Sequence, residues 1–381
     1  MSKRFRRKAF LFRVCFLVLA GQVLLLCHRW AEEEQQEHYS VEILPRIHFT
    51  PAESNLSLKS SSALITEPSF SSGSQRRDEL SDTLWPADTF RNRTLVVVLG
   101  SLRCGEAAWK SLYRNVLDVN NADLAVITQA KPKSDNSRHT VSLLQRAKYV
   151  WEVPSFTDWA DALDLMAGGR AWRERVPEYY TDHESGILGG ALNYSGSGAI
   201  IFWYRWFLTE RIRELNWKSR YDRFVITRSD HFYLCPHDIN ELDPYFMWVP
   251  QGQTWGGVTD RYLVVNASNV LEALNILPPL LKNPSRYSNY LQRKVNTEHF
   301  LAMRWREQSL FPDKRNKFPR TMFVCMARED ALTSWKPLGI EVFPGVFTKY
   351  HIEFSTSQQA CRMSRQERLD FIARKSNLLP T

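Results

Sequence analysis

A continuous apolar stretch that ends in a charged turn constrains this chain more than any other segment. Residues 222–230 read Asp-Arg-Phe-Val-Ile-Thr-Arg-Ser-Asp, so an apolar run is followed directly by Arg228 and Asp230. Such a run is typical of a buried strand in a parallel sheet. In open α/β sheets, ligands bind at the carboxyl ends of the strands. The stretch therefore predicts an α/β fold with Asp230 at a ligand-binding edge.

Apolar runs and helical periodicities alternate along the rest of the chain from residue 91 onward. This alternation predicts a mixed, mainly parallel sheet flanked by helices, in one large domain over 91–381. We expect strands at 94–99, 123–128, 149–153, 224–226, 247–249, 262–265 and 322–325, and helices at 107–117, 197–215, 270–277 and 297–307. Residues 362–381 are expected to form a surface helix and tail.

The positive charge of the chain is concentrated at its N-terminus. The 381 residues carry a formal charge of +9, and six basic residues and no acid lie within the first 27. About +3 is left for the other 354 residues. A nucleic-acid-binding surface needs clustered excess charge in the folded part. We therefore expect no nucleic-acid partner.

The first 90 residues predict a membrane anchor and a spacer. Residues 1–8 are a basic cytosolic tail, and the apolar stretch 9–27 approaches the roughly 20 residues that cross a bilayer. Because positive flanks stay in the cytosol, the rest of the chain would be lumenal. A cleaved signal peptide is the alternative, but bulky residues follow Cys27 where small ones would be expected. Residues 28–90 are polar and Ser-rich, which predicts a disordered stem.

Cysteines and glycosylation sequons agree with the secretory pathway. Four cysteines lie beyond the anchor, namely Cys104, Cys235, Cys325 and Cys361. In an oxidising compartment they allow three disulfide pairings, and the sequence does not choose between them. Four Asn-x-Ser/Thr sequons are present, at Asn55, Asn92, Asn193 and Asn266.

The turn after the apolar run has three interpretations. Asp230, with His231 beside it, could bind a divalent cation through carboxylate oxygen, with diphosphate oxygens completing the shell. Alternatively Asp230 caps a turn or pairs with Arg228. Arg228 could also neutralise phosphate directly, because a guanidinium makes bidentate contacts to it.

Two glycine-containing segments are further candidates for donor binding. Gly100 to Gly105 follows the first predicted strand, and Arg103 within it could bind a nucleotide phosphate or base edge. Gly256 and Gly257 follow Trp255, so the backbone could approach a sugar closely there while the indole stacks on it. The alternatives are ordinary tight turns, from strand to helix in the first case and in a hairpin in the second.

Two acids are candidates for the general base of a transfer reaction. Asp260 follows the glycine pair, and Glu298 begins the helix predicted at 297–307. Either could deprotonate an acceptor hydroxyl. A carboxylate in the first helical turn is also favoured by the helix dipole alone. His351 is a candidate late metal ligand, although a lone histidine is more often structural.

The order of these segments resembles type II Golgi glycosyltransferases of the GT-A class. A closer likeness, over roughly residues 94–310, is to transferase-like proteins that share Gly-x-x-Arg (here 100–103), Tyr-Asp-x-x-(Val/Ile)-x-x-Arg-x-Asp (221–230), Gly-x-x-Asp-Arg-(Phe/Tyr) (257–262) and Asn-x-Glu (296–298). The family implies a GT-A-like fold, a nucleotide-sugar donor, a glycan or glycoprotein acceptor, and Mn²⁺ or Mg²⁺. This sequence departs from the family where Arg228 replaces the first acid of Asp-x-Asp.

Two other function classes are alternatives. The segment 100–105 is similar to the phosphosulfate-binding turn of Golgi sulfotransferases, but Glu106 follows it where hydroxyls would cradle the phosphate. A non-enzymatic glycan-binding protein on a decayed transferase fold is the other alternative.

Overall fold

The structure is a computed structural model that describes residues 93–130, 141–177, 186–292, 295–332 and 337–376. The predicted cytosolic tail 1–8, anchor 9–27 and stem 28–90 lie outside these residues. No helix within the described ranges is long and apolar enough to cross a bilayer.

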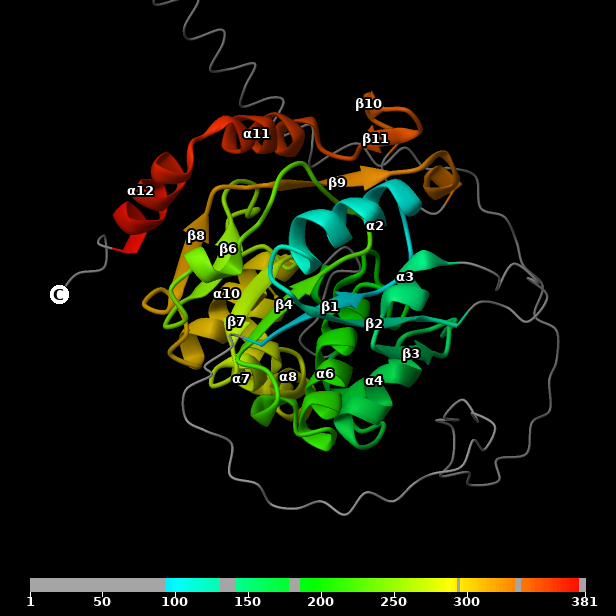
Figure 1. Ribbon diagram of the computed structural model, residues 1–381. Helices are drawn as coiled ribbons and strands as arrows, with labels where there is room; N and C mark the ends of the chain where they lie inside the picture. Colours follow the sequence, from blue (N-terminus) through cyan, green and yellow to red (C-terminus); the bar gives the residue numbers. More distant parts are fainter. Residues whose placement is uncertain (1–92, 131–140, 178–185, 293–294, 333–336, 377–381) are drawn as a thin grey trace, which may run out of the picture. The chain divides into compact units, whose positions relative to one another are not determined.

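A seven-stranded mixed sheet lies at the centre of the described part of the chain (Figure 1). Its strands are β1 (Thr94–Leu99), β2 (Asp123–Gln129), β3 (Tyr149–Val153), β4 (Arg223–Thr227), β6 (Met247–Pro250), β7 (Leu263–Asn266) and β8 (Arg315–Phe318). They are ordered β3-β2-β1-β4-β7-β6-β8. The first four run parallel, β7 runs antiparallel to β4 and β6, and β6 and β8 are parallel. The predicted mixed, mainly parallel sheet is confirmed.

Helices flank this sheet and a smaller sheet adjoins it. The main helices are α2 (Glu106–Leu112), α4 (Ala160–Ala167), α6 (Gly198–Glu214), α7 (Val270–Leu274), α8 (Pro278–Lys282), α10 (Thr297–Glu307), α11 (His351–Arg362) and α12 (Arg365–Ser376). The second sheet has the order β10-β11-β9-β5. Its strands are β5 (His231–Tyr233), β9 (Met322–Met326), β10 (Glu341–Phe343) and β11 (Val346–Thr348).

Alternate residues of the central strands enter two separate cores. On β1, Leu95 and Val97 pack with α4, α6, α7, α8 and α10, whereas Val96 and Val98 pack with α2 and the smaller sheet. Successive side chains of a strand point to opposite faces, so a strand covered on both faces must be apolar throughout. This double burial explains the continuous apolar run that identified the strand.

Most expected elements have the expected bounds within one or two residues, and two helices differ. The helix expected at 107–117 becomes a π-helical turn from Tyr113 to Leu117. The helix expected at 270–277 ends at Leu274, and α8 starts at Pro278. Pro278 has no amide hydrogen to donate to a preceding carbonyl, so it begins a new helix more readily than it continues one.

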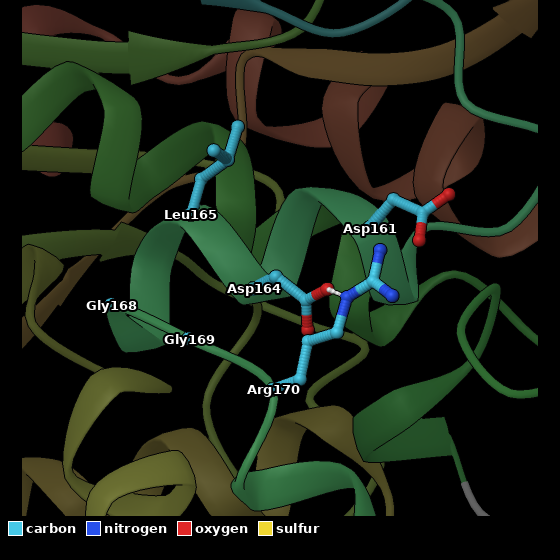
Figure 2. A pocket seen from close by; sticks show the side chains of 6 residues that line it. All are labelled: Asp161, Asp164, Leu165, Gly168, Gly169 and Arg170. Carbon is cyan, nitrogen blue, oxygen red and sulfur yellow. Dashed lines mark hydrogen bonds and ion pairs between the residues drawn. The ribbon is translucent and has the colours of Figure 1, made fainter. Parts of the chain in front are cut away.

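A pocket on the helical side lies over α4 and the turn that follows it (Figure 2). Its acid Asp164 accepts hydrogen bonds from Arg170, Arg173 and the indole of Trp172. These bonds neutralise the carboxylate within the protein. The pocket therefore offers a ligand no uncompensated charge at Asp164. It is lined by Asp161, Asp164, Leu165, Gly168, Gly169 and Arg170.

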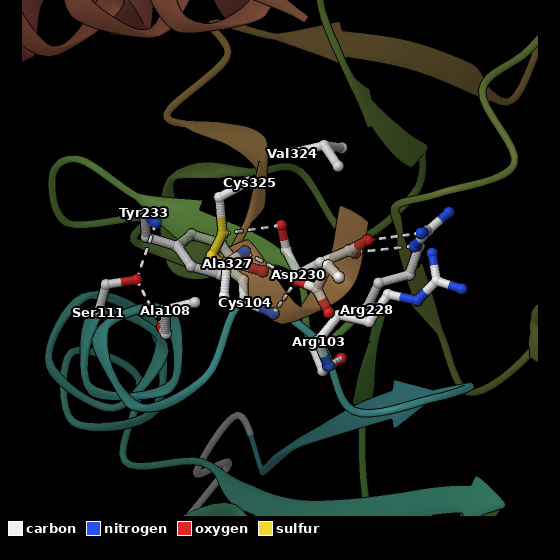
Figure 3. Close-up of a disulfide and its surroundings, with 12 residues drawn as sticks. Arg103, Cys104, Ala108, Ser111, Arg228, Asp230, Tyr233, Val324, Cys325 and Ala327 are labelled. Carbon is white, nitrogen blue, oxygen red and sulfur yellow. Dashed lines mark hydrogen bonds and ion pairs between the residues drawn. A yellow bond between two sulfur atoms is a disulfide. The ribbon is translucent and has the colours of Figure 1, made fainter. Parts of the chain in front are cut away.

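Two disulfides resolve the open question of cysteine pairing. Cys104 is bonded to Cys325, and Cys235 is bonded to Cys361. The first bond ties the loop after β1 to β9, directly beside Asp230, whose carbonyl accepts from the Cys325 amide at 2.8 Å (Figure 3). The second ties the segment after β5 to α11.

Removing the first disulfide should lower the stability of the protein. In the double variant Cys104→Ser/Cys325→Ser, we expect the free energy of unfolding to fall by about 2–5 kcal/mol, because the bond closes a very long loop in the unfolded chain. Urea denaturation of the full chain measures this change. The pair Cys235→Ser/Cys361→Ser serves as comparison, and an unchanged midpoint in the first variant would contradict the expectation.

Candidate active site

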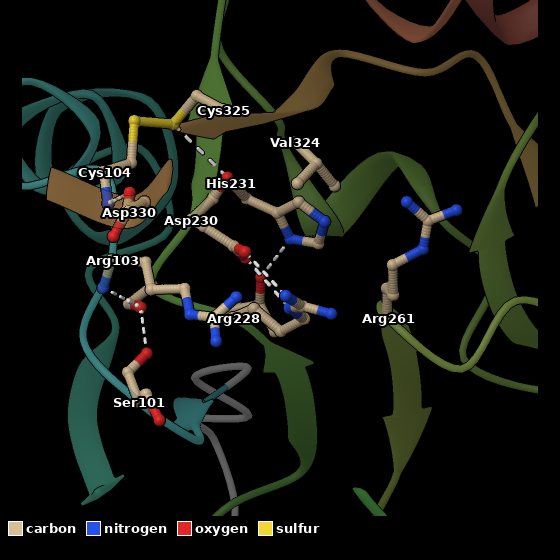
Figure 4. Close-up of polar contacts among 12 residues, drawn as sticks. Ser101, Arg103, Cys104, Arg228, Asp230, His231, Arg261, Val324, Cys325 and Asp330 are labelled. Atoms are coloured by element: carbon tan, nitrogen blue, oxygen red, sulfur yellow. Dashed lines mark hydrogen bonds and ion pairs between the residues drawn. A yellow bond between two sulfur atoms is a disulfide. The ribbon is translucent and has the colours of Figure 1, made fainter. Parts of the chain in front are cut away.

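The parallel pairing of β1 with β4 brings two predicted donor-binding segments together. Residues 94–98 pair in register with residues 223–227, so the loops after both strands leave the sheet at one edge. The Ser229 hydroxyl accepts from the Arg103 amide at 2.9 Å and donates to the Ser101 carbonyl at 2.8 Å. The Arg103 side chain points toward Arg228 and Asp230 (Figure 4).

Arg228 and Asp230 form a bidentate ion pair. Arg228 Nε and Nη2 donate to the two Asp230 carboxylate oxygens at 2.9 and 2.6 Å. The Asp230 side chain is 3% exposed and the Arg228 side chain 28%. Burial alone would raise the pKa of Asp230, but the charge and hydrogen bonds of Arg228 lower that pKa to about 2. Asp230 is therefore ionised and both of its carboxylate oxygens are hydrogen-bonded to Arg228, while the Arg228 side chain remains partly accessible to solvent.

His231 is part of the core. Its Nδ1 lies 2.8 Å from the Thr227 hydroxyl, and the ring is buried. Burial lowers the pKa of His231 to about 3, because the charged form would lose its hydration. Both observations favour a structural role for this residue.

The glycine pair packs against the first turn of α10. A Cβ on Gly256 would lie 2.5 Å from the His299 ring, and a Cβ on Gly257 would lie 2.2 Å from the Glu298 carbonyl oxygen. The Val258 amide donates to that same carbonyl at 3.1 Å. The close approach that both glycines permit is thus to a helix of the protein itself. Donor binding by Gly256 and Gly257 stays a prediction, since this packing explains the glycines without it.

The same packing brings the two candidate bases together. Asn296 caps α10 and also donates to the Trp255 carbonyl at 2.9 Å, which joins the helix to the loop before Asp260. Burial, and then the nearby Asp260 carboxylate, raise the pKa of Glu298 to about 8. A carboxyl with a pKa near neutrality is suited to exchanging a proton with a substrate hydroxyl.

Glu353 is a buried acid that the sequence analysis did not identify. It pairs with Arg261, the residue that follows Asp260. Glu353 of α11 is 1% exposed and pairs with Arg261 Nη1 at 3.0 Å and Arg320 Nη1 at 3.2 Å. It also accepts from the Val324 amide at 3.1 Å. Arg261 lies over the Tyr350 ring, 4.9 Å from its centre. Glu353 is therefore the counter-ion that allows two guanidiniums to be buried.

Lys349 completes a group of positive charges at this edge. Burial lowers the pKa of Lys349 to about 8, and the neighbouring positive charges of Arg228, Arg103 and Arg261 act in the same direction. Sequence reasoning missed Lys349 and named its neighbour His351 instead. The sequence carried no clear signal for Lys349, because the strand before it, Val346–Thr348, is too short to show a period.

The residues predicted to hold a metal do not come together as a cation site. Both Asp230 oxygens are bonded by Arg228. His351 is exposed, and its contacts are with Ser355 and Phe354 of its own helix. Within the described ranges, no three His, Cys, Asp or Glu side chains form a group that could hold a metal ion. Asp230 and His351 therefore do not fit Mn²⁺ or Mg²⁺ in this arrangement.

Substituting Gly257 should disturb the contact between the loop and α10. In Gly257→Ala the new methyl group meets the Glu298 backbone, so we expect the free energy of unfolding to fall by about 1–3 kcal/mol. Gly186→Ala is a matched control, because its Cβ would meet the same helix at an ordinary 3.4 Å from Thr297 Oγ1. Urea denaturation compares them, and equal effects would refute the steric argument.

Neutralising Glu353 should destabilise the protein strongly. Glu353→Gln removes the counter-ion of buried Arg320 and leaves Arg261 with Asp260 alone, whose Oδ1 lies 4.0 Å from Arg261 Nε, and we expect a loss of about 3–5 kcal/mol in the free energy of unfolding. Glu341→Gln, at an exposed position on β10, should change it by less than about 0.5 kcal/mol. Chemical denaturation of both variants would reveal whether the ion pairs matter; similar midpoints would argue that they do not.

No protein-family model matches this chain, and no curated protein matches it. Its function is therefore inferred from the chemistry of the site. That site consists of a cationic strand edge with Arg103, Arg228 and Lys349, and a pair of neighbouring carboxyls at Asp260 and Glu298.

Proposed function

We propose that this protein is a glycosyltransferase that moves a sugar from a nucleotide-diphosphate donor to a glycan or glycoprotein acceptor. The observation that carries the proposal is the convergence of two kinds of group at one sheet edge. Cations at Arg103, Arg228 and Lys349 suit a diphosphate, and the raised pKa of Glu298 suits a general base. The mixed, mainly parallel sheet supports a GT-A-like fold.

In the proposed reaction Glu298 accepts the proton of the acceptor hydroxyl. The hydroxyl oxygen then bonds to the anomeric carbon, and the bond from that carbon to the diphosphate breaks. The electron pair leaves with the nucleoside diphosphate, whose negative charge the cations stabilise. Burial, and then the Asp260 carboxylate, keep the pKa of Glu298 raised, so that its carboxylate is a stronger base than an exposed glutamate.

We further propose a Golgi location with the domain in the lumen. Two disulfides among the four downstream cysteines support an oxidising compartment. The sulfotransferase alternative gains no support from the loop after β1. Glu106 occupies the first turn of α2 there and accepts from Ser142 Oγ at 2.6 Å, so a carboxylate lies where the phosphate would bind.

The Glu298→Gln variant tests the proposed base. We expect it to bind nucleoside diphosphates as the wild type does and to lose about 10²- to 10⁴-fold in turnover, because the amide cannot accept the proton. Nucleoside diphosphate release from a panel of nucleotide sugars measures turnover in the full chain.

The pH profile gives a second measurement on the same variant. Wild-type turnover should rise with pH until the Glu298 pKa of about 8 is passed, since only the ionised form is a base. The residual turnover of Glu298→Gln should lack that rise, and Glu341→Gln should keep it. Unchanged turnover in Glu298→Gln would exclude this residue as the base. Glycan binding without any nucleotide binding would instead favour the lectin-like alternative.

A further inference from the structure

We infer that Arg103, Arg228 and Lys349 bind the donor diphosphate through side-chain cations and without a divalent metal ion. This inference rests on the proposed function and specifies how its donor is held. It departs from the metal dependence that the resemblance to GT-A enzymes implies.

The first argument is the occupancy of Asp230. A metal ion at this carboxylate would have to displace the Arg228 guanidinium from two hydrogen bonds of 2.9 and 2.6 Å. Bidentate, charge-assisted pairs are among the strongest hydrogen bonds in proteins. The Asp230 side chain is also 3% exposed, so little of it is available to a hydrated cation. Asp230 is better described as the residue that orients Arg228.

The second argument is the gathering of three cations around this pair. Arg103 and Lys349 lie close enough to Arg228 for their charges to affect one another, and the carboxylates of Asp230 and Asp260 offset part of this repulsion. Arg261, the next cation, has Glu353 as its counter-ion. An anion bound at this edge would relieve the repulsion among the cations.

The third argument is the geometry of the strand ends. Arg103 and Arg228 follow two adjacent parallel strands, and Ser229 fixes one loop to the other. A guanidinium offers a planar set of donors to phosphate oxygens, and the Arg228 side chain is 28% exposed after pairing with Asp230. Two guanidiniums and an ammonium can therefore share the oxygens of one diphosphate.

Binding of UDP, GDP and inorganic pyrophosphate to the full chain tests the inference. Titration calorimetry would be performed once with EDTA and once with MnCl₂. For the nucleoside diphosphate that binds best, we expect dissociation constants that agree within about threefold between the two conditions, because side-chain cations supply the positive charge. Binding that requires Mn²⁺, or tightens more than tenfold with it, would overturn the metal-free site and leave the proposed transferase intact.

Variants identify the residues responsible. Arg103→Ala and Lys349→Gln should each weaken binding in EDTA by about tenfold or more, since each removes a charge-assisted contact. Arg103→Lys keeps the charge and should restore part of the loss. Arg170→Ala is the control, because that exposed arginine pairs with Asp164 on the helical side. Full affinity in both Arg103→Ala and Lys349→Gln would refute the inference, and no diphosphate binding in any condition would refute the proposed function itself.

Discussion

The parallel register between β1 and β4 is the constraint on which the rest of the site depends. Because Val98 pairs with Thr227, the next residues of both strands turn at the same level of the sheet. Arg103 and Arg228 become neighbours for that reason, and the Ser229 hydroxyl joins the loops that carry them. A slip of one residue would place these side chains on the opposite face of the sheet.

Much of the sheet could be predicted from the sequence, but its short strands could not. β1 and β3 have the predicted bounds because burial on both faces or regular alternation leaves a pattern over five or six residues. β5, β10 and β11 have three residues each, which is too few to show a period. They are defined by their pairing with neighbouring strands, β5 and β11 with β9 and β10 with β11.

Individual residues of the candidate site could be predicted from the sequence, but their arrangement in space could not. Asp230, Asp260 and Glu298 were recognisable as acids near strand or helix ends. Their partners were not, because the pairing of Glu353 with Arg261 joins segments that share no local pattern. The glycine pair shows the same limit: its sequence suggested a close approach, but the structure shows that α10 is what approaches.

Because of Glu353, the C-terminal part of the chain matters for the core, although the helices of that part lie at the surface. α11 and α12 lie at the periphery in Figure 1, yet α11 buries Glu353, Ser357 and Ala360, and Glu353 pairs with the arginines beneath the cationic edge. A truncation before this residue would remove the only carboxylate that pairs with both Arg261 and Arg320 in the described part of the chain. Shortened versions of this protein should therefore retain α11 even where the helix that follows is dispensable.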